Sequence, residues 1–218
     1  MVTTAGSPAG ERLPLILDIL RQTHPDARCA LAYQTPFQLL VATILSAQCT
    51  DKMVNRVTPA LFARYPDPES MAKANLAELT EAIHSITFYR QKGRYLQETA
   101  HRLLQLHGGQ VPDEPKALHK LQGVARKTAN VVLGEIFGKA EGVVVDTHVK
   151  RLSQRLGLTK ESSPEKIERD LMALVAREDW IGLSHLFIFH GRRICHARKP
   201  TCPVCPIRQL CPAGTSYK

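Results

Sequence analysis

Residues 118–137 read LHKLQGVARKTANVVLGEIF, and no other stretch says as much about how the chain folds. Four apolar residues recur at the i, i+3, i+4, i+7 spacing of one helix face: Ala129, Val132, Leu133 and Ile136. They predict a helix over Arg126–Phe137, preceded by a shorter helix that ends with Leu118 and Leu121. Residues 122–125 (Gln-Gly-Val-Ala) form a tight turn between the two, so the stretch is predicted to be a helix–hairpin–helix.

The turn of this hairpin is suited to hold a phosphate. Backbone N–H groups of the turn and of the next helix's first turn point outward, where the helix dipole favours an anion. Glycine at position 123 lets a ligand approach the backbone closely. The residues expected to contact a phosphate backbone are Gly123, Val124, Ala125 and Arg126.

Lys127 lies in the first turn of the predicted second helix. The helix dipole, the charge of Arg126 and any burial all disfavour the ammonium form of its side chain. A neutral lysine amine is a nucleophile. The alternative is a solvated surface lysine, which is the commoner environment of a single lysine.

Asp146 follows the apolar run Val143–Val145 and stands at the start of another predicted helix, which carries Val149 and Leu152. From the residues alone, the role that Asp146 fills best is that of a helix N-cap. The second interpretation is a carboxylate that assists the lysine by electrostatics or proton transfer.

The rest of the chain is also predicted to be helical. One apolar stripe marks a first helix: Leu13, Ile16, Leu17 and Leu20. Thr-Pro, Asp-Pro and Ser-Pro pairs at 35–36, 67–68 and 163–164 predict three helix starts, the second of them before a helical stretch over 71–86. The strand-like run at 143–145 is too short to imply a sheet, and the glycine-bounded segment 138–142 is the predicted hinge. We expect an all-α chain of about ten helices with a boundary near residue 140.

Four cysteines lie close together near the C-terminus, spaced C-x6-C-x2-C-x5-C: Cys195, Cys202, Cys205 and Cys211. Four neighbouring thiolates need a metal to neutralise their charge, and both zinc and a [4Fe–4S] cluster accept four cysteines. The single C-x2-C knuckle favours iron–sulfur, and unpaired or disulfide-bonded cysteines are the third possibility. A metal would hold the loop between the first two ligands rigid and present Arg198 and Lys199 outward. The alternative is that Arg198 and Lys199 are ordinary solvated charges on a loop.

The charge balance favours a polyanionic partner. Lys and Arg number 29 against 20 Asp and Glu, a net charge of +9. Six basic and no acidic residues lie over 190–218, and a second basic cluster occupies 89–94. Such clusters are typical of surfaces that contact nucleic-acid phosphates.

No stretch approaches the roughly 20 apolar residues that span a bilayer. The first ten residues lack the apolar core of a signal peptide. We therefore expect an intracellular protein, cytoplasmic and nucleoid-associated if bacterial, with no membrane partner. A monomer is the default expectation.

Taken together, these residues resemble the endonuclease III family of helix–hairpin–helix DNA glycosylases. The matching segments are LQGVARKTANVV, VVDTHV, HGRRIC, the cysteine spacing, and the SAQCTD segment at 46–51. They occur in the family's order from about residue 35 to the C-terminus.

The resemblance implies two helical lobes flanking a DNA-binding cleft. One is a six-helix lobe over residues 29–140, and the other joins 1–28 to 141–218 and holds a [4Fe–4S] cluster on the four cysteines. Lys127 matches the catalytic lysine and Asp146 the catalytic aspartate. Gln48 matches a residue that fills the gap left by an extruded nucleotide, and Phe88 lies where the family carries a wedge against the opposite strand.

The implied activity is that of a bifunctional base-excision repair enzyme, a DNA glycosylase and AP lyase. Its substrate would be double-stranded DNA with oxidised pyrimidines or abasic sites, and it would act through a lysine Schiff base and β-elimination. The hairpin departs from the family's L-P-G-V-G, since Gln122 replaces proline and Ala125 replaces glycine. Ala125 is expected to strain the turn or to hold the phosphate farther away.

Three other interpretations stay open. Adenine-DNA glycosylases share the fold and cluster but lack the catalytic lysine, so Lys127 argues against them. A non-catalytic DNA-binding module would need the basic surface but not the Lys127 and Asp146 pair. A structural zinc protein would be colourless, whereas a [4Fe–4S] protein is coloured.

Overall fold

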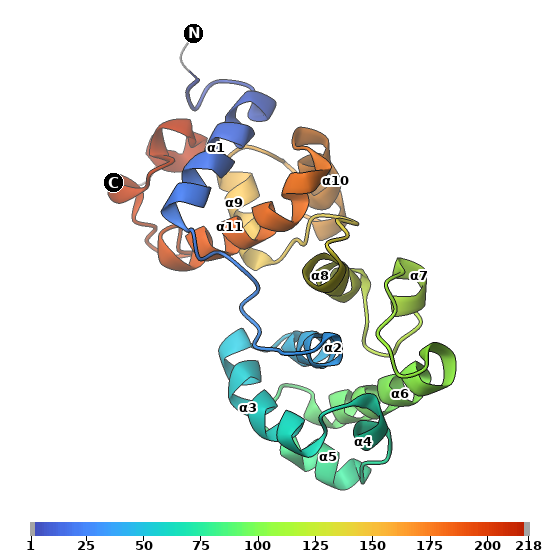
Figure 1. The fold of residues 1–218 in the computed structure, drawn as a ribbon. Helices are drawn as coiled ribbons and strands as arrows, with labels where there is room; N and C mark the ends of the chain where they lie inside the picture. The colour runs from blue at the N-terminus through green and yellow to red at the C-terminus, as the bar shows by residue number, and fades with distance from the viewer. Residues whose placement is uncertain (1–2, 216–218) are drawn as a thin grey trace. The chain divides into compact units, whose positions relative to one another are not determined.

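The computed structural model describes residues 3–215, and every regular element among them is a helix (Figure 1). The α-helices are α1 (Ala9–Thr23), α2 (Pro36–Ser46), α3 (Asp51–Arg64), α4 (Pro68–Ala72), α5 (Leu76–Ala82), α6 (Tyr89–His107), α7 (Pro115–Leu118), α8 (Arg126–Phe137), α9 (Thr147–Arg155), α10 (Pro164–Leu174) and α11 (Trp180–Arg193). Short 3-10 helices are η1 (Arg177–Asp179), η2 (Cys202–Val204), η3 (Arg208–Leu210) and η4 (Pro212–Thr215). The all-α prediction is confirmed. None of the described helices is long and apolar enough to cross a bilayer.

The chain forms two compact units. One comprises Cys29–Glu141, and the other joins the chain up to Arg28 with the chain from Gly142 onward. The second boundary falls in the glycine-bounded segment 138–142, where α8 has just ended at Gly138 with a left-handed backbone (φ 63°). Each unit has a hydrophobic core of its own.

In the unit Cys29–Glu141, helix α2 lies at the centre. It packs against α3, α6 and α8, and all of its residues from Phe37 to Leu45 are buried. Its start follows from local chemistry, because the Thr35 hydroxyl accepts a hydrogen bond from the Gln38 N–H and Pro36 takes the first helical position. A helix that is apolar on every side can exist only inside such a core.

Helices α4 and α5 differ from the prediction of one continuous helix over 71–86. The Asn75 side chain accepts hydrogen bonds from the N–H groups of Ala77 and Glu78, which starts a second helix within that stretch. A side chain that caps a helix start competes with continuation of the preceding helix. Both short helices pack against α6.

The other unit is built around α1, α9, α10 and α11. Segments far apart in the sequence lie side by side here, because α1 packs against both α10 and α11 (Figure 1). The predicted stripe on α1 is fully buried: Leu13, Ile16, Leu17 and Leu20. The run 143–145 forms no strand and instead buries Val143 and Val145 in this core. Burying these apolar surfaces holds α9 and α11 in place, and α11 leads to the cysteine segment.

Candidate active site and metal centre

The hairpin turn before α8 requires glycine at position 123. Gly123 has φ 75°, and a Cβ there would lie 2.9 Å from Tyr95 Cδ2 and 3.2 Å from Ile44 Cγ2. The Thr99 hydroxyl donates to the Gln122 carbonyl oxygen at 3.0 Å, and Arg102 donates to the carbonyl of the preceding turn. Helix α6 therefore fixes the turn from one side. A left-handed residue in so close a contact accepts only glycine without rearrangement.

Ala125 does not strain the turn, so the first of the two expected effects is wrong, and a greater distance to the phosphate stays a prediction. Its backbone is extended (φ −79°, ψ 171°), a conformation that any residue adopts. Ala125 occupies the N-cap position of α8 without a side-chain hydrogen bond to the helix. The first N–H groups of α8 are therefore not capped by Ala125, which is the arrangement that an anion-binding helix start needs.

Lys127 is exposed at the second position of α8, and Arg126 before it is also exposed. The three residues that follow, Thr128, Ala129 and Asn130, are buried. Helix α8 is therefore packed into the core immediately after the exposed Lys127. This exposure is what the alternative of a solvated surface lysine predicts, and the role of Lys127 as a nucleophile stays a prediction.

Asp146 is the N-cap of α9, as the residues alone favoured. Its Oδ1 accepts hydrogen bonds from the N–H groups of His148 and Val149, both at 2.8 Å. Among the described residues, no hydrogen bond to Oδ2 is found. The N-cap role therefore leaves one carboxylate oxygen for a second role. Lys127 belongs to the unit Cys29–Glu141 and Asp146 to the other, and their presence in one cleft stays a prediction.

Three predicted DNA-contacting residues share an unusual backbone conformation. Within residues 3–215, the non-glycine residues with positive φ are Gln48 (53°), Phe88 (58°) and Lys199 (53°). All three are exposed, and Phe88 exposes 57% of its surface. Left-handed backbone is unfavourable for residues with a Cβ by about 1–2 kcal/mol, and such strain collects at functional sites.

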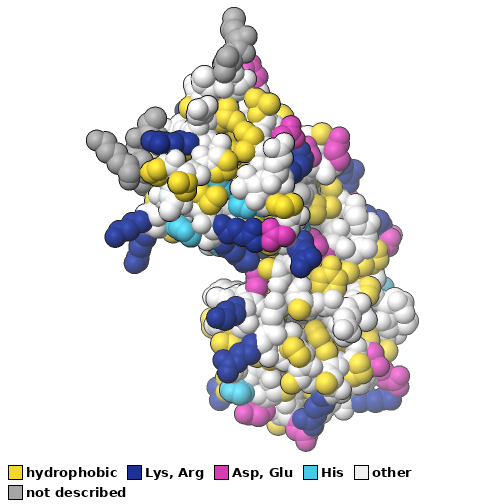
Figure 2. All heavy atoms as spheres, turned by 60° about the vertical axis from the view of Figure 1, so that its left-hand side comes forward, with side chains coloured by type: hydrophobic (Ala, Val, Ile, Leu, Met, Phe, Trp, Pro, Cys, Tyr) yellow, Lys and Arg dark blue, Asp and Glu magenta, His cyan; other side chains and the backbone are white. Residues whose placement is uncertain are grey.

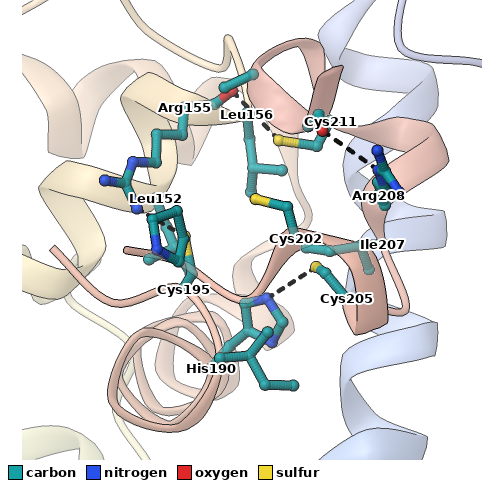
Figure 3. A pocket seen from close by; sticks show the side chains of 14 residues that line it. Leu152, Arg155, Leu156, His190, Cys195, Cys202, Cys205, Ile207, Arg208 and Cys211 are labelled. Atoms are coloured by element: carbon teal, nitrogen blue, oxygen red, sulfur yellow. Dashed lines mark hydrogen bonds between the residues drawn. The ribbon is translucent and has the colours of Figure 1, made fainter. Parts of the chain in front are cut away.

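The four predicted metal ligands line one cavity. Figure 3 shows the side chains of Cys195, Cys202, Cys205 and Cys211 around a common space, between the end of α9 and the 3-10 helices that follow Cys195. Its empty volume is about 430 Å³, part of which is open to solvent. The segment also has apolar anchors that the sequence prediction overlooked, since Ile207 and Leu210 are buried in the core of their unit.

The electrostatics of this cavity favour a bound cation. Burial, with a smaller contribution from the neighbouring cysteines, raises the pKa of the Cys205 thiol to about 11 against a backbone hydrogen bond that lowers it. Arg155 donates to Cys195 Sγ at 3.2 Å. One guanidinium cannot neutralise four thiolates, whereas iron or zinc can. The donor set therefore fits a metal centre.

The positions of the four cysteines do not select the metal. Among the described residues, no group of three or more His, Cys, Asp or Glu side chains is placed to hold one metal ion. Both zinc and an iron–sulfur cluster accept four cysteines, and the choice between them stays a prediction.

Two histidines next to the cysteines were not predicted as site residues. His190 Nδ1 lies 3.1 Å from His24 Nε2, and His190 Nε2 lies 3.5 Å from Cys205 Sγ. Both imidazoles are buried, and burial lowers the pKa of His190 to about 4. His190 belongs to the HGRRIC segment, which could have drawn attention to it. His24 carried no signal, because the contact joins residues 166 positions apart.

The loop between the first two cysteines presents Arg198 and Lys199 on the surface, as predicted. Arg155 holds the base of this loop by donating to the carbonyl oxygens of His196 and Ala197. Basic side chains are also visible elsewhere on the molecule (Figure 2). The second basic cluster, over 89–94, is less open than its composition suggested, because Lys92 is 5% exposed.

Known proteins match this chain along most of its length. Residues 41–177 match the family model of the HhH-GPD superfamily base excision DNA repair proteins. The chain is 54% identical to endonuclease III of Synechocystis sp., over 94% of this chain and 93% of that protein. It is 43% identical to endonuclease III of Bacillus subtilis, with the same two coverages.

Solved structures give the same relationship. A trapped endonuclease III–DNA covalent intermediate has a TM-score of 0.89 at 41% identity and covers 99% of each chain. A non-covalent endonuclease III–DNA complex has the same score and identity, with coverages of 99% and 98%. A thermostable thymine-DNA glycosylase, 23% identical with a TM-score of 0.80, shares the fold.

Proposed function

This chain belongs to the endonuclease III family of base-excision DNA repair proteins, and we propose that Lys127 is its nucleophile and Asp146 the carboxylate that assists it. The family makes the chain an enzyme, a DNA glycosylase with lyase activity at abasic sites. Its proposed substrate is duplex DNA that carries oxidised pyrimidines. The observation that supports this most strongly is an exposed lysine on a rigid helix start, next to a hairpin turn suited to a phosphate.

The first proposed contacts join the protein to the phosphate backbone of DNA. The turn at Gly123 and the uncapped start of α8 offer N–H groups to a phosphate, and Arg126 adds charge. Gln48 and Phe88 are proposed to enter the duplex, while Arg198 and Lys199 contact phosphates. A damaged nucleotide stacks and pairs poorly, so its extrusion costs less than that of a normal one.

The chemistry then follows from one amine. Lys127 Nζ attacks the sugar C1′ with its lone pair, and the C1′–N bond breaks with its electron pair leaving on the base, which takes up one of the two protons that the amine nitrogen releases. The C1′–O4′ bond then opens, O4′ takes up the second of these protons, and the nitrogen forms a Schiff base with C1′. The Asp146 carboxylate stabilises the positive charge that develops on the sugar.

The Schiff base makes the C2′ proton acidic. Loss of that proton forms the C2′–C3′ double bond and breaks the C3′–O bond, so the 3′ phosphate leaves. Water then hydrolyses the imine and restores the Lys127 amine. Each step uses only the lysine, a carboxylate and water.

We propose that the four cysteines hold a [4Fe–4S] cluster. When bound, the cluster would supply the positive charge that four thiolates need and would cross-link the segment 195–211. In this way it would fix the loop that carries Arg198 and Lys199. The purified protein is expected to contain iron and sulfide and to absorb broadly near ~400 nm. Cys202→Ser should lose that absorbance while Cys49→Ser keeps it, and a colourless protein with one bound zinc would contradict the assignment.

The nucleophile is tested by borohydride reduction on duplexes with oxidised pyrimidines or a preformed abasic site. Lys127→Gln should bind the duplex as tightly as wild type but form no covalent adduct and release no base. Lys120→Gln, in the turn before the same hairpin, is the matched control and should form the adduct. Adduct formation by Lys127→Gln at the wild-type level would show that another group is the nucleophile.

A further inference from the structure

Lys92 is a buried lysine inside the unit Cys29–Glu141. It exposes 5% of its surface, which is rare for a lysine. Its Nζ donates to the carbonyl oxygen of Leu45 at 2.8 Å and to that of Ala47 at 2.6 Å. Burial lowers its pKa, and the amine keeps N–H donors in either protonation state.

One of the two acceptors lies in the peptide directly before Gln48. Helix α2 ends at Ser46, and carbonyl groups at the end of a helix lack partners within it. The Ala47 carbonyl belongs to the peptide that joins Ala47 to Gln48, so its hydrogen bond fixes the plane of the peptide from which φ of Gln48 is measured. That φ is 53°.

The backbone of Lys92 holds the second left-handed residue. The Lys92 N–H donates to the carbonyl oxygen of Phe88 at 3.0 Å, which is the first helical hydrogen bond of α6. Phe88 has φ 58° and no side-chain cap. Next to Lys92, a Cβ at Gly93 would lie 2.7 Å from Thr80 Oγ1, so α6 packs tightly against α5 at this point. Lys92 is therefore fixed at both its side chain and its backbone.

We propose that Lys92 is a positioning residue that holds Gln48 and Phe88 as one preformed pair of tips for insertion into DNA. The proposal rests on the proposed function. Without the Lys92 amine, the Ala47–Gln48 peptide can rotate and Gln48 can leave the unfavourable left-handed region. The insertion-competent conformation is then a smaller fraction of the population, and the apparent affinity and rate of extrusion fall by that fraction.

The test compares Lys92→Met with Lys73→Met, which removes an exposed lysine from the same unit. Extrusion is followed by 2-aminopurine fluorescence next to a fully paired lesion, and base release is followed in single turnover. Lys92→Met should slow both by about ten- to a hundredfold, while Lys73→Met matches wild type. On an abasic nucleotide already extruded as a one-nucleotide bulge, all three proteins should cleave at similar rates.

Two more variants complete the test. Lys92→Arg, which keeps the donors, should restore extrusion. In a double-mutant cycle, Gln48→Ala should remove most of the difference in extrusion rate between the wild-type and the Lys92→Met backgrounds. If Lys92→Met does not fold, Lys92→Leu, which also has no donor, replaces it with the same expected and contradicting results.

Two outcomes overturn the proposal. One is a folded Lys92→Met variant that extrudes the paired lesion at the wild-type rate, and the other is equal slowing on the paired and bulged substrates. Failure of the nucleophile proposal would instead show as adduct formation by Lys127→Gln, and it would leave the fluorescence comparison between wild type and Lys92→Met intact.

Discussion

Asp146 combines a structural role with the proposed chemical one, and a single substitution separates them. Asp146→Asn keeps an Oδ1 acceptor for the N–H groups of His148 and Val149 but removes the charge. The free energy of unfolding should change by less than about 0.5 kcal/mol. Single-turnover base release should fall about 10²-fold.

Asp67→Asn is the matched control, because Asp67 caps α4 through a hydrogen bond of the same kind. It should leave base release unchanged. If Asp146→Asn releases the base at the wild-type rate, Asp146 has no role in the chemistry and acts only as the N-cap of α9.

The buried side chain of His24 should make the free energy of unfolding depend on pH. Burial lowers the pKa of His24 from 6.5, the charge of Arg193 lowers it further, and Asp26 opposes both. Its Nδ1 is buried without a hydrogen-bond partner among the described residues, so a proton there has no acceptor. The unfolded chain takes up this proton near pH 6.5, whereas the folded chain takes it up only at lower pH. The contribution of His24 to the free energy of unfolding is therefore fully present above pH 6.5 and is lost as the pH falls below it.

Chemical denaturation between about pH 7.5 and pH 5.5, on either side of the ordinary histidine pKa, measures this loss. His24→Gln should make the decline less steep, with the rest due to His190, whose pKa burial also lowers, and His101→Gln, which replaces an exposed histidine, should keep the full decline. A decline as steep in His24→Gln as in wild type would assign the effect to other groups.

At the scale of elements, the hairpin before α8 needs glycine at position 123 for two reasons, a left-handed backbone and close contacts to its neighbours. Gly138 shares the first reason but not the second, so the two glycines together separate the effects. Gly123→Ala combines a left-handed alanine with contacts to Tyr95 and Ile44, whereas Gly138→Ala has the same backbone penalty with nothing within 4 Å of the new Cβ. We expect Gly138→Ala to lower the free energy of unfolding by about 1 kcal/mol, and Gly123→Ala by about 2–4 kcal/mol. Urea denaturation of both variants checks this, and equal losses would mean that the turn accommodates the methyl group.

Elements with strong local signals could be predicted from the sequence. Thr35 and Pro36 start α2 as expected, and the apolar spacing of 129–136 gives α8 its observed bounds. The break between α4 and α5 was missed because Asn75 is an ordinary polar residue in the sequence, and only its side-chain hydrogen bonds show that it caps the next helix. Short-range chemistry decides the first two cases, and competition between two helix starts decides the third.

The site itself was predictable only in part. The cysteine spacing, Lys127 and Asp146 are readable because each motif is local. The left-handed backbone of Gln48 and Phe88 is not, since neither residue type prefers it and the Lys92 amine reaches the Ala47 carbonyl from 45 positions away. The His24–His190 contact is equally non-local.

At the scale of the whole molecule, a net charge of +9 predicts salt-sensitive binding. The logarithm of the association constant for duplex DNA should fall linearly with the logarithm of salt concentration. Arg198→Gln should reduce the slope by about 1 if that guanidinium contacts a phosphate. Lys73→Gln, at a position that the resemblance does not assign to DNA, should keep the wild-type slope, and an unchanged slope in Arg198→Gln would remove that residue from the interface.

The central claim is that one amine becomes covalently attached to the DNA sugar. Mass spectrometry of the borohydride-reduced complex, after digestion of protein and DNA, identifies the attached residue directly. We predict a sugar remnant on the peptide that contains Lys127 and on no other. A remnant on a different residue, or an adduct-free protein after complete cleavage of the lesion strand, would contradict the claim.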